Sequence, residues 1–293
     1  MNKLTYLIPN VVAEIGCNHK GNFEIAKEMI DVARYCKATI AKFQKRNPKE
    51  LLNEEQYNAP HINSYNSYGN TYGEHREFLE FTQEQHAELK KYCENKNIIY
   101  ATSVWDVIST KEIIELNPKY IKVPSAINNN FEVLKLLRDN YIGDVHISLG
   151  MTTISEEKEI ISFFEKTNCA KDKLIIYSCT SGYPVTFNNI CLLEILRLYD
   201  VYQNRVKDIG FSGHHLGIAA DIAAYTLGAN WIERHFTLDR TWKGTDHAAS
   251  LEPEGLKKLI RNLKATYESL NYKQKEILDI EEEQRKKLKY KNN

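Results

Sequence analysis

The stretch KDIGFSGHHLGIAADIAAYTLGANWIERHFT, residues 207–237, decides the fold. Two short apolar runs flank one helix-length segment, 217–228, as in a unit of two parallel strands joined by a helix. His214 and His235 each stand at the end of one of these runs. Ligands bind at the carboxyl ends of the strands in parallel α/β folds. We therefore expect the two imidazoles to lie side by side, where they can hold a divalent metal. The alternative is two ordinary polar residues at strand ends.

The same alternation runs through the rest of the chain. Strands are predicted near 10–15, 38–43, 98–102, 119–123, 144–148, 173–178, 207–211 and 230–235. Helices are predicted at 22–36, 83–96, 107–115, 130–139, 155–166, 188–200, 217–228 and 254–270. Eight such repeats predict an α/β fold, a (β/α)8 TIM barrel over residues 1–270, followed by a charged helical tail over 271–293. An open doubly wound sheet is the alternative, which is weakened because no GxGxxG follows the first strand.

Composition excludes several classes of protein. The 293 residues include 39 Lys and Arg against 39 Asp and Glu, so no net charge favours binding to nucleic acid or to an anionic membrane. No apolar run approaches the roughly 20 residues of a membrane span, and the N-terminus has no apolar signal core. Six cysteines stand at 17, 36, 93, 169, 179 and 191. None forms a CxxC pair, so we expect reduced thiols and a cytoplasmic protein.

One connection in the predicted barrel is much longer than the others. Residues 44–82, after the second strand, are rich in Tyr, Asn, His and Gly. Connections of this length are usually functional or disordered. The aromatic residues favour a loop that covers a substrate over a flexible linker.

Two lysines stand inside apolar strands. Lys42 and Lys122 would face the barrel interior, where a charge is costly unless it is paired or bound to a ligand. One interpretation is an internal ion pair with Glu14 or Glu233. Another is an anion site, because strand ends also carry the hydroxyls of Ser103, Ser125, Ser148 and Ser212. A Schiff-base lysine is a third possible use.

The motifs AEIGCNHKGNFEIAKEMIDVA, AKFQ, SVWD, IKVPSA, ISLGM, SCTSGYP, GFSGHHLG, GANWIERHFTLDR and GTDHAASLEP occur in this order over residues 10–260. In this order they resemble the sialic acid synthase family, whose relatives make other nonulosonic acids. The resemblance implies a (β/α)8 barrel that condenses phosphoenolpyruvate with an aldose such as N-acetylmannosamine and releases phosphate. It also implies a divalent metal, Mn2+ or Mg2+, and we expect a homodimer.

The resemblance implies roles for particular residues. His214 and His235 match the metal ligands, and Glu14 matches an acid beside the metal and the reacting centre. Residues matching contacts to phosphoenolpyruvate are Lys42, Lys122, Ser125, Ser148 and Ser212, with Ser103 where many members have Thr. Asp246 matches an acid that contacts the acceptor sugar, and Gln44, Asn18 and Tyr183 fall in motifs on the sugar side.

The chain departs from the family in three places. Ala126 and Ile127 stand where many members have Gly-Glu, and Ser212-Gly213-His214 replaces the usual Ser-Asp-His. The C-terminal antifreeze-like domain of the family is expected to be absent. The acceptor is therefore not defined by the resemblance. Two alternatives are a Schiff-base lysine aldolase or lyase on the same fold, and a non-catalytic barrel that acts as a partner in a glycan-biosynthesis complex.

Overall fold

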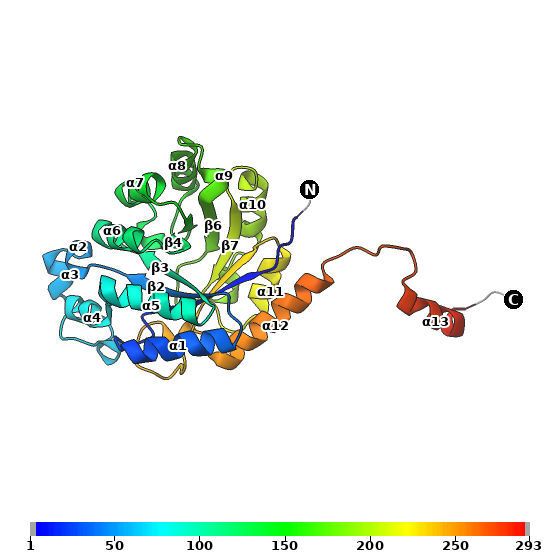
Figure 1. Cartoon of the computed structure of the whole chain (residues 1–293), viewed down its shortest axis with the longest axis horizontal. Coiled ribbons are helices and arrows are strands. Elements are labelled where there is room, and N and C mark those ends of the chain that lie inside the picture. Colours follow the sequence, from blue (N-terminus) through cyan, green and yellow to red (C-terminus); the bar gives the residue numbers. More distant parts are fainter. Residues whose placement is uncertain (1–3, 291–293) are drawn as a thin grey trace.

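A computed structural model describes residues 4–290 (Figure 1). Eight parallel strands form a closed barrel in chain order, which confirms the predicted (β/α)8 fold. The strands are β1 (Asn10–Gly16), β2 (Ile40–Lys45), β3 (Ile99–Val104), β4 (Tyr120–Val123), β5 (Asp144–Ser148), β6 (Leu174–Cys179), β7 (Asp208–Gly213) and β8 (Trp231–His235). Each lies within a few residues of its prediction, because the apolar runs that signal buried strands are short and separate.

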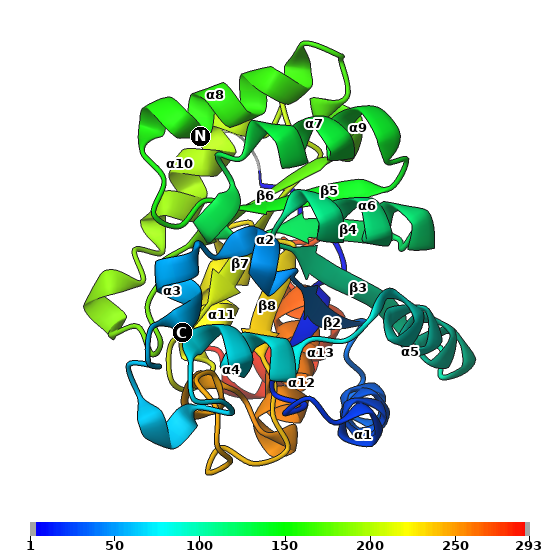
Figure 2. The ribbon, with the colours of Figure 1, turned by 90° about the vertical axis from the view of Figure 1, so that its left-hand side faces the viewer.

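The helices surround the barrel (Figure 2). The eight predicted ones are α1 (Phe23–Tyr35), α5 (Gln83–Asn95), α6 (Val107–Leu116), α7 (Phe131–Asn140), α8 (Ile154–Glu165), α10 (Leu193–Tyr202), α11 (Ala219–Thr226) and α12 (Pro253–Ser269). A further short helix, α9 (Ala170–Lys173), precedes β6. The apolar faces of these helices and of the strands form one continuous core. Within residues 4–290, no helix is long and apolar enough to cross a membrane.

The register of the strands decides which polar side chains are neighbours inside the barrel. Glu14 lies opposite Lys42 across β1 and β2, and Ser212 lies opposite Glu233 across β7 and β8. Two residues earlier on several of these strands, the interior is filled by a separate apolar cluster of Val12, Ile40, Ala101 and Tyr120. The polar layer therefore rests on a closed floor and is open only toward the carboxyl ends of the strands.

The long connection after β2, predicted as a loop that covers a substrate, contains short helices. It contains α2 (Pro48–Leu51), α3 (Glu54–Asn58), a 3-10 turn (Ser64–Asn66) and α4 (Tyr72–Leu79). Tyr68 donates a hydrogen bond to the carbonyl of Lys243 at 2.5 Å, and Asn66 accepts one from the amide of Gly244 at 3.2 Å. The connection thus packs against the segment that follows β8.

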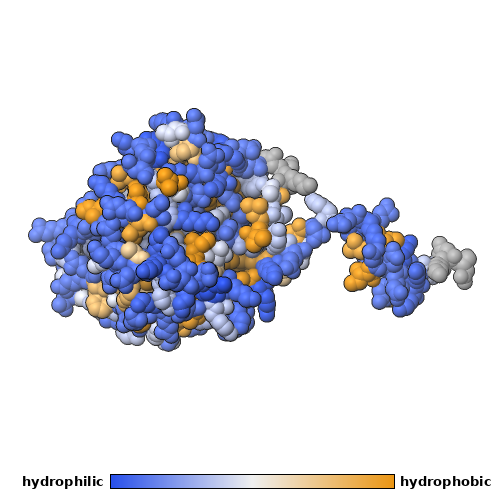
Figure 3. All heavy atoms as spheres, in the orientation of Figure 1, coloured by the Kyte–Doolittle hydropathy of each residue, from blue (hydrophilic) through white to orange (hydrophobic). Residues whose placement is uncertain are grey.

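The charged tail is helical over only part of its predicted length. Helix α13 (Asp279–Leu288) follows a non-helical segment, and residues 291–293 lie outside the described part of the chain. Figure 1 shows α13 standing away from the barrel, and Figure 3 shows hydrophobic residues on it. Ile280 and Leu288 are 83% and 78% exposed. The boundary at 270, between barrel and tail, stays a prediction.

Lowering the pH from 7 to 5 is expected to reduce the free energy of unfolding steeply. Burial lowers the pKa of His86 to about 3 and that of His19 to about 3, whereas unfolded histidines titrate near 6.5. The stability that these neutral rings contribute is therefore complete above about pH 6.5 and is lost as the pH falls toward 3. In urea unfolding, His86→Gln should lower the slope of stability against pH by up to about 1.4 kcal/mol per pH unit. An unchanged slope would show that His86 is not held neutral.

Candidate active site

A cavity of about 280 Å³ opens at the carboxyl ends of the strands. Its lining includes all the predicted site residues except Asp246 and Asn18: Glu14, Lys42, Gln44, Ser103, Lys122, Ser125, Ser148, Tyr183, Ser212, His214 and His235. Asp246 lies at its edge, with Oδ2 3.9 Å from Nδ1 of His235. The lining also contains residues that sequence reasoning did not assign to the site: Trp105, Pro124, Ala126, Met151, Cys179, Ser181 and Glu233.

Lys42 is held in an internal ion pair. Its Nζ lies 2.5 Å from Oε2 of Glu14 and donates to Oγ of Ser103 at 2.8 Å. The ammonium group is almost completely buried, so this pairing offsets much of the cost of its desolvation. The internal ion pair was one of the two main interpretations of this lysine. The other, contact with a substrate anion, stays a prediction, and it is compatible with the geometry because Lys42 lines the cavity.

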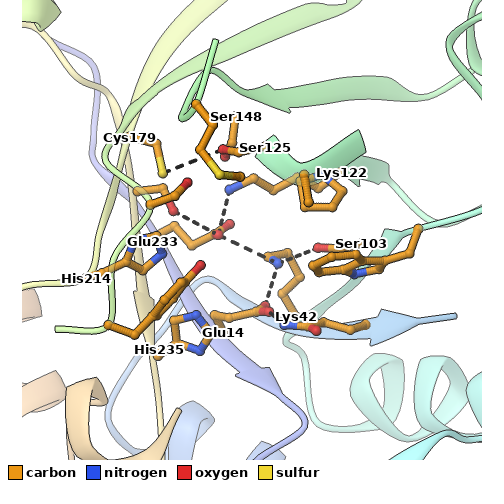
Figure 4. A pocket seen from close by; sticks show the side chains of 18 residues that line it. Glu14, Lys42, Ser103, Lys122, Ser125, Ser148, Cys179, His214, Glu233 and His235 are labelled. Atoms are coloured by element: carbon orange, nitrogen blue, oxygen red, sulfur yellow. Dashed lines mark hydrogen bonds and ion pairs between the residues drawn. The ribbon is translucent and has the colours of Figure 1, made fainter. Parts of the chain in front are cut away.

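Glu233 joins the two lysines (Figure 4). Its Oε1 lies 2.6 Å from Nζ of Lys122, 3.7 Å from Nζ of Lys42 and 3.3 Å from Oγ of Ser212. Burial acts to raise the pKa of the Glu233 carboxyl, but Lys122 and Lys42 outweigh it and hold that pKa below its usual range. Sequence reasoning considered Glu233 only as an ion-pair partner. Its place two residues before His235, on the same face of β8, is the signal that marks it as a cavity residue.

Lys122 also rests on an aromatic ring. Its Nζ lies 4.1 Å from the ring centroid of Tyr177, whose hydroxyl is 2.8 Å from Nδ1 of His146. Burial lowers the pKa of the Lys122 amine, and the charge of Glu233 acts against this shift. A buried cation with one face toward the cavity is suited to meet an anionic ligand.

On the side of the cavity that serine hydroxyls line, the backbone at Gly150 lies close to the side chain of Ser125. Ser125 accepts a hydrogen bond from the amide of Gly150 at 3.0 Å, and a Cβ on Gly150 would lie 2.7 Å from this hydroxyl. A side chain at Gly150 would therefore push the Ser125 hydroxyl out of its place. Asn128 donates to the carbonyl of Ser148 at 2.9 Å, which fixes the same strand end.

The two predicted metal ligands lie together, with their ring centroids 5.6 Å apart. Nδ1 of His214 lies 2.9 Å from the carbonyl of Thr180, and burial lowers the pKa of His214 to about 3. The ring is thus neutral at pH 7, and donation from Nδ1 leaves the lone pair on Nε2 free. The ring of Tyr183 packs 4.3 Å from that of His214 and 5.9 Å from that of His235.

These two imidazoles fit a divalent metal that takes most of its ligands from substrate and water. Two imidazoles, one of them fixed in the tautomer that a metal requires, are suitable first ligands. Among the described residues, no group of three or more His, Cys, Asp or Glu side chains is arranged to hold a metal ion. A metal on His214 and His235 alone would keep open positions, as a catalytic site needs, and would exchange readily.

The predicted sugar side is only partly assembled. Gln44 donates to Oε1 of Glu14 at 2.7 Å and accepts a hydrogen bond from Arg46. Asn18 does not line the cavity, contrary to the prediction, because its side chain donates to the carbonyl of Phe236 and to Ser250. It holds the segment after β8 in place.

The departure at 126–127 removes an acidic group from this side. Ala126 lines the cavity, whereas Ile127 is packed into the hydrophobic core. Neither residue supplies the carboxylate that the resemblance places at this point.

The fold and the cavity together define a TIM-barrel protein with a small-molecule site at the carboxyl ends of its strands. The chain belongs to the NeuB family, whose model matches residues 29–275. It is 38% identical over 273 residues to human N-acetylneuraminate-9-phosphate synthase, covering 92% of this chain and 74% of the relative. It is 31% identical to N,N'-diacetyllegionaminic acid synthase of Campylobacter jejuni, covering 87% of this chain and 75% of the relative. The crystal structure of N-acetylneuraminic acid synthetase from Leptospira borgpetersenii superposes with a TM-score of 0.80 at 29% identity, covering 97% of this chain and 94% of that one.

Proposed function

We propose that this protein condenses phosphoenolpyruvate with an aldose related to N-acetylmannosamine, giving a sialic acid or another nonulosonic acid and free phosphate. The observation that carries the proposal is one cavity with two buried lysines, five serine hydroxyls and a pair of neighbouring histidines. Membership of the NeuB family and the similarity to nonulosonic acid synthases support it. We also propose that the protein is cytoplasmic and forms a homodimer.

Lys42 and Lys122 are assigned to phosphoenolpyruvate. Both ammonium groups line the cavity, and each is already desolvated, so a phosphate or carboxylate oxygen meets them at low cost. The hydroxyls of Ser103, Ser125, Ser148 and Ser212 supply neutral donors around the same space. Cationic and neutral donors fixed in advance stabilise charge that builds on a departing phosphate.

His214 and His235 are assigned to the divalent metal, Mn2+ or Mg2+. When bound there, such an ion supplies Lewis-acid polarisation of the aldehyde carbonyl. Tyr183 lies against both rings, and we assign to it the orientation of the aldose that binds beside them. Asp246, near Nδ1 of His235, is assigned to the acceptor sugar.

The reaction needs one new C–C bond, one water and the loss of phosphate. The C3 carbon of phosphoenolpyruvate attacks the aldehyde carbon, and water adds to the positive centre left at C2. Phosphate then leaves as the bond between C2 and its bridging oxygen breaks. The water gives up one proton as it adds, and the former aldehyde oxygen gains one. We assign the second transfer to Glu14, because its carboxylate is fixed by Lys42 and Gln44 at the cavity wall.

Shortening residues 60–74 is expected to raise the KM for the aldose at least about 10-fold while phosphoenolpyruvate binding stays near wild type, because a lost ligand contact of about 1.4 kcal/mol is worth tenfold. The segment contacts the connection after β8 that carries Asp246. Steady-state kinetics with each substrate varied in turn measures the split. Unchanged aldose kinetics would reduce the segment to a structural or assembly role.

The direct test is to incubate the purified protein with phosphoenolpyruvate, Mn2+ and a panel of aldoses, free and phosphorylated. Phosphate release is followed, and the products are identified by mass. We expect release that depends on one class of aldose. Release from no member of the panel would contradict the proposal and favour a non-catalytic barrel.

A lysine Schiff-base reaction is the second candidate, because burial lowers the pKa of Lys122 as an amine nucleophile requires. Borohydride reduction in the presence of pyruvate separates the two. The synthase is expected to form no adduct. A stable adduct on Lys122 or Lys42, located by peptide mass, would favour the aldolase or lyase.

A further inference from the structure

A buried charged cluster lies behind the cavity, on the outer face of the barrel. Arg234 stands on β8 between Glu233 and His235, and its side chain is 1% exposed. Because successive side chains of a strand point to opposite faces, Arg234 points away from the cavity that its two neighbours line. Its partners are Asp221, in the first turn of α11, and His215, in the connection that follows β7.

The contacts of Arg234 cross from one strand end to the next. Its Nη1 lies 2.5 Å from Oδ2 of Asp221 and donates to the carbonyl of Gly217 at 2.8 Å. Its Nη2 donates to the carbonyl of His215 at 2.5 Å, and Nη1 lies 3.1 Å from Nε2 of the same residue. One guanidinium thus fixes two backbone carbonyls, a carboxylate and an imidazole. Lysine, with a single ammonium, cannot reproduce this planar fork.

The residues that this cluster joins are the immediate neighbours of the two candidate metal ligands. His215 follows His214, and Arg234 precedes His235. The Arg234 side chain thus connects the residue before His235 with the residue after His214. Packing alone does not require a charge here, because apolar residues of similar volume often replace a buried ion pair without loss of stability.

Gly213 explains how the ring of His215 fits. A Cβ on Gly213 would lie 2.8 Å from Cε1 of His215 and 2.8 Å from Cε1 of Phe211. The resemblance places Asp at this position. Glycine instead leaves the space that the His215 ring occupies. The glycine at 213 and the Arg234 cluster are therefore linked, because both contact the ring of His215.

We propose that Arg234, with Asp221 and His215, is a positioning residue that sets the spacing of His214 and His235 and thereby the affinity for the divalent metal. This inference rests on the proposed metal site. Groups that orient metal ligands without touching the metal typically change metal affinity 10- to 100-fold when they are replaced.

The test is Mn2+ binding to the purified full chain, measured from the loss of the free Mn2+ electron paramagnetic resonance signal, together with the thermal midpoint of each variant. Arg234→Met and Asp221→Asn are expected to weaken Mn2+ binding about 10- to 100-fold, and Arg234→Lys less. Arg205→Met is the control, because it removes a different arginine ion pair, with Glu165 at 2.7 and 2.8 Å, outside the cavity. This control should keep its Mn2+ affinity, and its thermal midpoint should change little because the pair is partly exposed.

Gly213→Ala is a second, smaller perturbation, in case Arg234→Met does not fold. It pushes on the His215 ring and should also weaken Mn2+ binding while removing no charge. Folded Arg234→Lys and Gly213→Ala variants that bind Mn2+ as the wild type does would overturn the inference, even where the thermal midpoint falls. A wild-type protein that binds Mn2+ but releases no phosphate would instead contradict the proposed function and leave the positioning result readable.

Discussion

Replacing His214 or His235 with alanine is expected to lower kcat at least about 1,000-fold, since a Lewis acid contributes several kcal/mol and 1.36 kcal/mol is a factor of ten. The two rings line the cavity, with centroids 5.6 Å apart, and His214 is held neutral by burial. Each variant loses one of the two candidate protein ligands. The fold should survive, because both side chains lie at the open end of the barrel and not in its apolar core.

His86→Gln is the matched control for this loss. His86 is also buried and neutral, but it pairs with the hydroxyl of Tyr100 outside the cavity. Its variant should change stability and keep turnover. Treating the wild type with a chelator should abolish activity, and adding back Mn2+ or Mg2+ should restore it. Full activity after chelation, or in both histidine variants, would exclude the metal assignment.

The fold was predictable because the barrel repeats one local pattern. Each strand is a short apolar run, and most of the predicted polar residues lie where such a run ends. Because the carboxyl ends of parallel strands meet at one end of the barrel, these residues were predicted to lie together. Two residues differ: Asn18 does not line the cavity, and Asp246 lies at its edge. Both lie on connections, where the direction of a side chain depends on contacts distant in sequence, such as that of Asn18 with Ser250.

The short helices after β2 were missed although the sequence carries their signals. Asn53 with Gln56, and Thr71 with Glu74, form capping boxes at the starts of α3 and α4. We predicted a loop instead, because residues 44–82 are rich in Tyr, Asn and Gly. The cluster around Arg234 was not predictable, because it depends on which carbonyls the folded chain turns toward one guanidinium.

Lys42→Met and Lys122→Met are expected to raise the KM for phosphoenolpyruvate about 10- to 150-fold, the equivalent of one charge-assisted hydrogen bond of about 1.5–3 kcal/mol. The aldose KM should change little, because neither lysine contacts Tyr183 or the segment after β8 in the described structure. Lys45→Met is the matched control. Lys45 is a buried lysine of β2 that pairs with Glu112 at 3.1 Å outside the cavity.

The ion pairs of these lysines complicate such single variants, because removing Lys122 leaves Glu233 buried with a weaker partner. The double variant Lys122→Met, Glu233→Gln resolves this. If Lys122 serves only to neutralise Glu233, the double variant should regain most of the lost use of phosphoenolpyruvate. If Lys122 meets the substrate anion, the defect should persist, since the carboxylate is gone and the positive charge is still missing. We expect persistence, with stability partly restored in urea unfolding. Recovery of wild-type kinetics would show that Lys122 serves only as the ion-pair partner of Glu233.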